Sequence, residues 1–249
     1  MTNSTKFLYR TVAAVLFPIA LQLTAGCGGK SSDPVDDGNP PITRQPITQY
    51  VYTVVNEYPH DPYAYTEGLE YFDGFLYEGT GQEENSSLRR VDLTTGQVLQ
   101  MRRLPTRPGG GHYFGEGITI LGDRIYQQTW LDSIGFIYDR ESFDSLGEFR
   151  INAQPWGLAN DGHRMIMSTR SEWLYYCDPV TQQKTDSIRV RDHDGVVDSL
   201  NEMEYINGEI WANIWTSPKV AIINPQNGLV TGYLDLTGQI GRASCRERV

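Results

Sequence analysis

Residues 116–130 read EGITILGDRIYQQTW: an acidic residue, an apolar strand, a Gly122-Asp123 turn and a second strand that ends in tryptophan. Three other segments align with this one. The four are Glu67 to Tyr77, Glu116 to Tyr126, Trp156 to Ile166 and Asn201 to Trp211. Each has a turn of glycine, aspartate or asparagine between its two strands, which is typical of a β-hairpin. A third strand, an Asp- or Asn-led turn and a fourth strand follow each hairpin.

The spacing of these repeats predicts the fold. They start at 67, 116, 156 and 201, which are 49, 40 and 45 residues apart. Four short strands at roughly that period indicate the blades of an all-β propeller. Residues 50–55 form one more apolar strand without a preceding partner. Because closing the ring removes an exposed edge, this strand is expected to complete the last blade. We therefore predict a five-bladed β-propeller over residues 50–239, with an incomplete last blade.

The last ten residues depart from the repeat. Residues 240–249 read IGRASCRERV, which is basic and fits none of the blade positions. The stretch resembles one reading frame of a sequencing adapter. We therefore predict that it is a non-native tail, and a genuine basic C-terminus is the alternative.

The first 49 residues predict export. In residues 1–26 a short basic head precedes an apolar run over 12–23, as in a secretory signal and too short for a membrane span. Thr24-Ala25-Gly26-Cys27 follows the run and resembles a lipobox, so Cys27 is the predicted lipidation site. Residues 27–49 would be a flexible tether. These features predict a lipoprotein of the cell envelope, in the outer membrane. A secreted protein with an incidental cysteine is the alternative.

Composition excludes several classes of function. The formal net charge is −10, which would repel a phosphate backbone, so nucleic acid is not an expected partner. Cys27, Cys177 and Cys245 are each better explained alone than as a bridge. Since there is no CxxC pair and no Cys/His cluster with zinc spacing, no metal site is predicted.

The starts of the repeats should converge in space. The innermost strands of a propeller surround one axis, so equivalent positions meet at the mouth of the channel. The converging residues would be Glu67, Phe114, Glu116, Trp130, Trp156, Asn201, Glu202 and Trp215. Aromatic walls around a few carboxyl and amide groups are typical of a small-ligand site. Burial by such walls raises the pKa of a glutamate and suits it to proton transfer near neutrality.

Each of these residues also has a structural interpretation. The three tryptophans could pack between blades, and Glu116 could cap a turn or pair with an arginine. Glu202 and Glu204 are better interpreted as solvent-facing or blade-bridging than as catalytic. His60-Asp61 is better interpreted as a structural hydrogen-bonding pair than as a metal site.

Six motifs stand in order over about residues 50–236. They are YPHDP at 58–62 with TEGL at 66–69, FGEGI at 114–118, QTW at 128–130, WGL at 156–158, LNEMEY at 200–205 and ANIW at 212–215. Together they resemble the plant- and bacterial-type glutaminyl-peptide cyclotransferases, or glutaminyl cyclases. The resemblance implies a five-bladed propeller that needs no cofactor and, unlike the animal-type cyclases, no zinc.

The resemblance also implies roles for single residues. Glu116 would be the catalytic acid and base, and Asn201 would bind the substrate amide. The aromatic pocket would consist of Phe114, Trp130, Trp156 and Trp215. The chain departs from the family at three places: Glu67 replaces a glutamine of the pocket, Gln154-Pro155 replaces Glu-Gly, and Ser168-Thr169-Arg170 replaces Ser-Asp-Gly.

The implied reaction converts the N-terminal glutamine of a peptide or protein into pyroglutamate and releases ammonia. Two other functions stay open from the residues alone. One is a non-catalytic surface propeller that binds a peptide or glycan. The other is a calcium-dependent lactonase or sugar hydrolase, which would need more converging Glu, Asn and Asp ligands than this centre offers.

Overall fold

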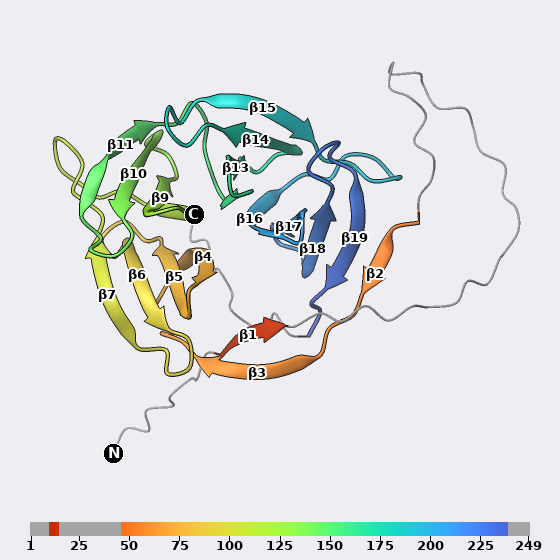
Figure 1. Cartoon of the computed structure of the whole chain (residues 1–249), viewed down its shortest axis with the longest axis horizontal. Coiled ribbons are helices and arrows are strands. Elements are labelled where there is room, and N and C mark those ends of the chain that lie inside the picture. The colour runs from red at the N-terminus through yellow and green to blue at the C-terminus, as the bar shows by residue number, and fades with distance from the viewer. Residues whose placement is uncertain (1–9, 15–45, 239–249) are drawn as a thin grey trace, which may run out of the picture.

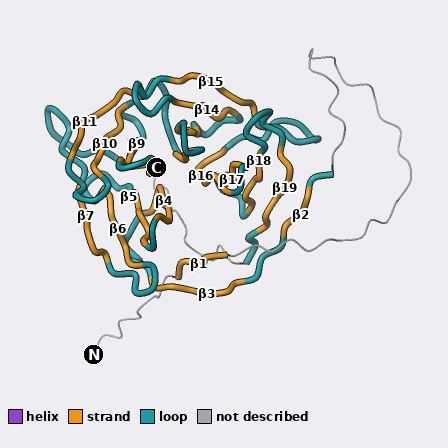
Figure 2. Tube along the Cα trace, viewed as in Figure 1, coloured by secondary structure: helices purple, strands orange, loops and turns teal. Residues whose placement is uncertain are grey.

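The computed structural model describes residues 10–14 and 46–238, and the regular elements in this part are all strands (Figures 1 and 2). Within these residues no helix is long and apolar enough to cross a membrane. Cys27, the predicted tail at 240–249 and most of the predicted signal and tether lie outside the described residues.

The strand boundaries follow the repeat. The strands are β1 (Arg10–Ala14), β2 (Thr48–Tyr50), β3 (Val54–Pro59), β4 (Thr66–Phe72), β5 (Phe75–Thr80), β6 (Ser87–Asp92), β7 (Val98–Arg103), β8 (Gly115–Leu121), β9 (Arg124–Thr129), β10 (Ile134–Asp139), β11 (Ser145–Arg150), β12 (Leu158–Asn160), β13 (Met165–Ser168), β14 (Trp173–Cys177), β15 (Lys184–Arg189), β16 (Leu200–Ile206), β17 (Glu209–Ile214), β18 (Lys219–Ile223) and β19 (Val230–Asp235).

The strands form four antiparallel blades around a central axis, which confirms the all-β propeller (Figure 1). The first blade is β4–β7, the second β8–β11, the third β12–β15 and the fourth β16–β19. Strand order equals chain order in each blade, and the first strand is innermost. Each innermost strand therefore lies nearest the axis, and β4, β8 and β16 carry Glu67, Glu116 and Asn201 close to their starts.

The turns repeat as the sequence predicts. Asp73-Gly74 and Asn207-Gly208 have positive φ at both positions, the geometry of a type I′ hairpin turn. The turn before each fourth strand is led by Asp92, Asp139, Asp178 or Asn224, and each of these side chains accepts a backbone N–H two residues on. Such Asx turns fix the chain reversal locally. This shared chemistry explains why the blades superpose in sequence.

The hydrophobic core lies between the blades. One cluster, which includes Leu88 and Ile118, joins the first blade to the second. A second cluster with Phe149 and Met165 joins the second to the third, and a third with Ile166 and Met203 joins the third to the fourth. Within the described residues none of these three clusters joins the fourth blade to the first.

Glycines let the innermost strands touch at the axis. A Cβ added to Gly68 would stand 2.5 Å from the backbone nitrogen of Ile118, and one added to Gly117 would stand 2.6 Å from that of Leu158. A Cβ on Gly157 would overlap the carbonyl oxygen of Asn201. These approaches join blades one to two, two to three and three to four. The fourth blade contacts the first through a side chain, since Glu202 Oε1 accepts the Leu69 N–H at 3.1 Å.

The predicted count of five blades is not confirmed, because the structure has four blades of four or more strands. The predicted strand over 50–55 is split in two. β2 extends the fourth blade by pairing in parallel with β19, whereas β3 pairs antiparallel with β1. Residues 51–53 lie in no strand. The two-stranded β1–β3 sheet lies between the fourth and first blades (Figure 1).

The glycine contacts at the axis predict a stability effect. Gly117→Ala should lower the free energy of unfolding by about 1–3 kcal/mol, because the new methyl group must displace the backbone of the third blade. Gly122→Asn is the control. Gly122 has φ +66°, which asparagine tolerates, and open space around its Cβ position. Urea unfolding of both variants measures the difference. Equal stability of the two would contradict the proposed contact.

Candidate functional site

Glu116 lies at the inner start of β8, in the second blade. The residue is buried, with 6% of its surface exposed. The N–H of the next residue, Gly117, donates to the Trp156 carbonyl of the third blade at 2.9 Å. On the other side, a Cβ added to Gly79 of the first blade would stand 2.9 Å from the Glu116 carbonyl oxygen. The backbone of Glu116 therefore lies between the first and third blades.

The Phe114 cluster, made of Tyr65, Phe114 and Trp130, lies next to this point. The Phe114 ring is 6.0 Å from the Tyr65 ring and 5.7 Å from the Trp130 ring, in edge-to-face contacts. The Trp130 N–H donates to the Phe114 carbonyl at 3.0 Å. A Cβ on Gly81 would stand 2.6 Å from the Phe114 ring and 3.0 Å from Glu67 Cγ. Glu67 therefore lies beside this cluster.

The Trp156 cluster, made of Trp156, Arg170 and Trp215, comes from the third and fourth blades. The two indole rings are 5.4 Å apart in an edge contact. The Arg170 guanidinium lies 4.1 Å from the centre of the Trp215 ring and 5.0 Å from that of Trp156. These distances are within the range of cation–π attraction.

Asn201 is tied to the Trp156 cluster through its backbone. Ser168 Oγ donates to the Asn201 carbonyl at 2.9 Å and accepts the Gly157 N–H at 2.8 Å. The Asn201 side-chain amide makes no hydrogen bond among residues 10–14 and 46–238, and the residue is only partly buried. Its amide can therefore bind a ligand without breaking an internal contact.

The structure brings the predicted residues together in two groups. Glu67, Phe114 and Trp130 are in contact or adjacent, and so are Trp156 and Trp215. In the described part of the chain no ring contact joins the two groups. Their connection is the backbone hydrogen bond beside Glu116.

Two residues of the site were not predicted. Tyr65 precedes Glu67 by two positions, as Phe114 precedes Glu116, so the repeat register is the signal that identifies it. Arg170 was noted only as a departure from the family pattern. Its stacking on both tryptophans depends on a loop conformation that the sequence alone does not reveal.

His60 and Asp61 form structural contacts, as predicted. His60 Nε2 lies 2.8 Å from Glu78 Oε1, and Arg89 pairs with Asp61 at 2.9 Å. The hydrogen bond with the buried Glu78 raises the pKa of His60, against the opposing effect of burial. This network anchors the segment that leads to Tyr65.

Three glutamates lie on the innermost strands of the first and fourth blades: Glu70 on β4, and Glu202 and Glu204 on β16. Glu202 bridges these blades through Leu69, which confirms the blade-bridging interpretation. Burial, and then the charge of Glu204, raises the pKa of Glu202. Burial raises the pKa of Glu70 to about 7, although Ile120 and Thr119 donate to its carboxylate. Burial, followed by the charge of Glu70, raises the pKa of Glu204 to about 8.

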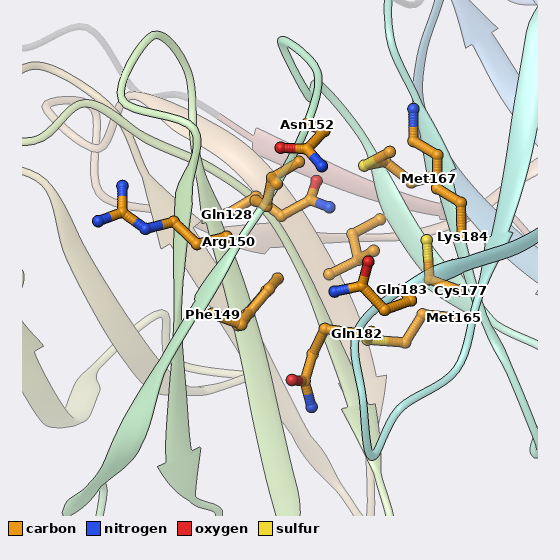
Figure 3. A pocket seen from close by; sticks show the side chains of 12 residues that line it. Gln128, Phe149, Arg150, Asn152, Met165, Met167, Cys177, Gln182, Gln183 and Lys184 are labelled. Atoms are coloured by element: carbon orange, nitrogen blue, oxygen red, sulfur yellow. The ribbon is translucent and has the colours of Figure 1, made fainter.

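A separate cavity of about 130 Å³ lies between the second and third blades (Figure 3). Its apolar wall includes Phe149, Met165 and Met167, which belong to the interblade core. Gln128 contributes a buried Oε1 without a hydrogen-bond partner in the described residues. None of the predicted site residues lines this cavity. Within residues 10–14 and 46–238 no group of His, Cys, Asp and Glu side chains is arranged to hold a metal ion.

Comparison with known proteins places the chain in a family. A family model described as glutamine cyclotransferase matches residues 24–248. A glutaminyl-peptide cyclotransferase of Arabidopsis thaliana is 42% identical over 186 residues, which are 74% of this chain and 57% of that protein. The crystal structure of Myxococcus xanthus glutaminyl cyclase superposes with a TM-score of 0.71 at 30% identity, over 77% of this chain and 79% of that one. The chain thus spans less than two thirds of its plant relative.

The axial glutamates predict that stability falls as the pH rises. Between about pH 5 and 8 the folded chain keeps protons on Glu70 and Glu204 that the unfolded chain has released. The free energy of unfolding therefore falls as the pH rises through this range. Glu204→Gln should raise the unfolding free energy at pH 8.5 by ~1–3 kcal/mol and flatten the pH dependence.

Urea unfolding between pH 5 and 9 measures this effect. Glu84→Gln is the control, because it removes the same charge from an exposed position on a loop. A Glu204→Gln variant that is less stable than the unchanged chain at pH 8.5 would contradict the assignment.

Proposed function

The chain belongs to the glutamine cyclotransferase family, and from this premise we propose that it is a glutaminyl-peptide cyclotransferase. Its substrates would be peptides or proteins that begin with glutamine, and its products pyroglutamyl peptides and ammonia. In reaction class it would be an acyltransferase, since the side-chain acyl group moves from one nitrogen to another. The plant relative and the Myxococcus structure carry names of this activity.

One observation carries the proposal. A buried glutamate, Glu116, stands at the inner start of a strand, next to the Phe114 cluster and hydrogen-bonded through its neighbour to the backbone of Trp156. The backbone beside this carboxyl-bearing residue thus links two aromatic clusters, which come from the second, third and fourth blades and from Tyr65. Such a site can hold a small polar group against apolar walls and move a proton to or from it.

The proposed reaction needs two proton transfers. The substrate α-amine, with an ordinary pKa near 8, attacks Cδ of its own side-chain amide in its neutral form. As the N–Cδ bond forms, Glu116 takes a proton from the attacking nitrogen. It then returns the proton to the amide nitrogen as the Cδ–N bond breaks, and ammonia leaves. The carboxylate ends the cycle unchanged.

Positioning would supply much of the rate. The attack is intramolecular, so selecting the folded-back conformer of glutamine can contribute up to ~7–11 kcal/mol when preorganisation is ideal. The two aromatic clusters would hold that conformer. The Asn201 amide would donate to the substrate carbonyl oxygen, which is worth ~3 kcal/mol when the donor is well placed. This pathway uses no metal or cofactor.

We further propose that the ring has five blade positions. The β1–β3 sheet lies between the fourth and first blades, where no hydrophobic cluster of the described residues joins them. This sector is the expected place of a fifth blade, in which β3 would be one strand. The axial contact of Glu202 with Leu69 would persist beside it.

Replacement of Glu116 tests the function. Glu116→Gln should lower kcat for a Gln-terminal peptide by about 10²–10⁴-fold, because the amide cannot accept the proton. The unfolding curve should stay close to that of the unchanged chain. Ammonia release, followed with and without a chelator, measures the activity.

Glu148→Gln is the matched control, because Glu148 is exposed on β11. Near-normal turnover by Glu116→Gln would refute the proposed role of Glu116. Loss of activity with the chelator would refute the metal-independent pathway. Absence of ammonia release by the unchanged chain would favour a binding propeller instead.

We also propose that the protein is a lipoprotein of the cell envelope, anchored through Cys27 to the outer membrane. The support is the signal-like composition of residues 1–26 and the lipobox-like ending before Cys27. Two or three acyl chains hold a protein stably on a membrane, whereas one barely does.

Replacement of Cys27 tests the anchor. Cys27→Ser should abolish incorporation of labelled palmitate and move the protein from the membrane fraction to the soluble fraction. Cys177→Ser is the control, since Cys177 is buried in the third blade and its thiol pKa is raised to about 11 by burial. Labelling that persists in Cys27→Ser would overturn the proposal.

A further inference from the structure

Arg170 occupies an unusual position beside the site. It lies in the loop between β13 and β14, with an exposed side chain and φ of +57°. That backbone conformation is uncommon for a residue other than glycine, asparagine or aspartate. Hydrogen bonds within the loop support this conformation: the Thr169 and Ser171 hydroxyls bond to each other, and Ser171 accepts the Trp173 N–H.

The contacts of Arg170 are aromatic and not ionic. Its guanidinium stacks over Trp215 and Trp156 at 4.1 and 5.0 Å. Among the ion pairs and hydrogen bonds of the described residues, none includes Arg170. The neighbouring acid, Glu172, pairs with Arg189 at 3.4 Å. Stacking uses the face of a guanidinium and leaves its N–H donors free in the ring plane.

The two clusters therefore carry side chains of opposite formal charge. Glu67 lies beside the Phe114 cluster, Arg170 stacks on the Trp156 cluster, and Glu116 lies where the backbone links the two. A peptide with an N-terminal amine has its positive charge at the reacting residue. A carboxylate located one residue further along would complement the guanidinium, which binds carboxylates through two parallel N–H donors.

We propose that Arg170 determines substrate specificity by binding a carboxylate next to the N-terminal glutamine. This inference rests on the proposed function. The carboxylate can come from an acidic side chain at the second position or from the C-terminus of a dipeptide. Both present the same planar anion, and a suitable peptide set distinguishes them.

The test compares kcat/KM among peptides that differ only in this charge. Gln-Glu-Ala-amide should exceed Gln-Ala-Ala-amide by about threefold or more, as expected for a partly exposed ion pair, and Gln-Lys-Ala-amide should rank last. Arg170→Gln should remove this order, and Arg170→Glu should reverse it. High salt should weaken the preference in the unchanged chain. Gln-Ala with a free carboxylate, compared with Gln-Ala-amide, tests the second source.

Arg189→Gln is the matched control. Arg189 belongs to the same blade and lies 6.0 Å from the Trp173 ring, away from the site tryptophans. Its removal changes the net charge equally and should leave the order of substrates unchanged. Equal turnover of all peptides by the unchanged chain, or the same order in Arg170→Glu, would overturn this inference but not the proposed function. Failure to cyclise any peptide would overturn both.

Discussion

The close approach of the innermost strands is the constraint on which the rest of the structure depends. At Gly68, Gly117 and Gly157 there is no room for a Cβ, because the backbone of the next blade occupies that space. Each glycine directly follows a residue predicted for the site: Glu67, Glu116 or Trp156. The glycine sets the distance between blades, and the residue before it is thereby placed at the mouth of the axis. Blade packing and the proposed site thus depend on the same dipeptide position in three successive blades.

The repeat made much of this arrangement predictable. Hairpin turns such as Asp73-Gly74 and Asn207-Gly208 encode their geometry locally, so the blades and the convergence of their starts follow from spacing. The lone N-terminal strand was predicted less well. Residues 51–53 read VYT and favour a strand, yet β2 ends before them and β3 begins after them with a different partner. Local propensity indicates that a segment can form a strand, but tertiary packing decides which sheet edge it pairs with.

The raised pKa values of the glutamates on the innermost strands could not be predicted from the sequence either. Glu70 and Glu204 stand on strands with the ordinary alternation of polar and apolar residues, and nothing in their spacing distinguishes them from solvent-facing acids. Their raised pKa values arise from burial on the innermost strands, and the charge of Glu70 adds to the effect at Glu204. Glu202 occupies the repeat position of the glycine in the other blades. Its side chain contacts Leu69 of the first blade, whereas the glycines bring the backbones themselves into contact.

Glu67, which replaces a glutamine of the family pattern, and Arg170 bring opposite formal charges to the proposed site. An extra carboxylate beside the Phe114 cluster favours the protonated form of a nearby amine, which opposes the attack that needs the neutral amine. The guanidinium on the Trp156 cluster acts on the second residue of the peptide and leaves the amine unaffected. In a chain of net charge −10, long-range attraction already favours cationic peptides, so a local cation is what allows an acidic peptide to be held. Selection by charge at this site therefore depends on the loop that presents Arg170 more than on the net charge of the chain.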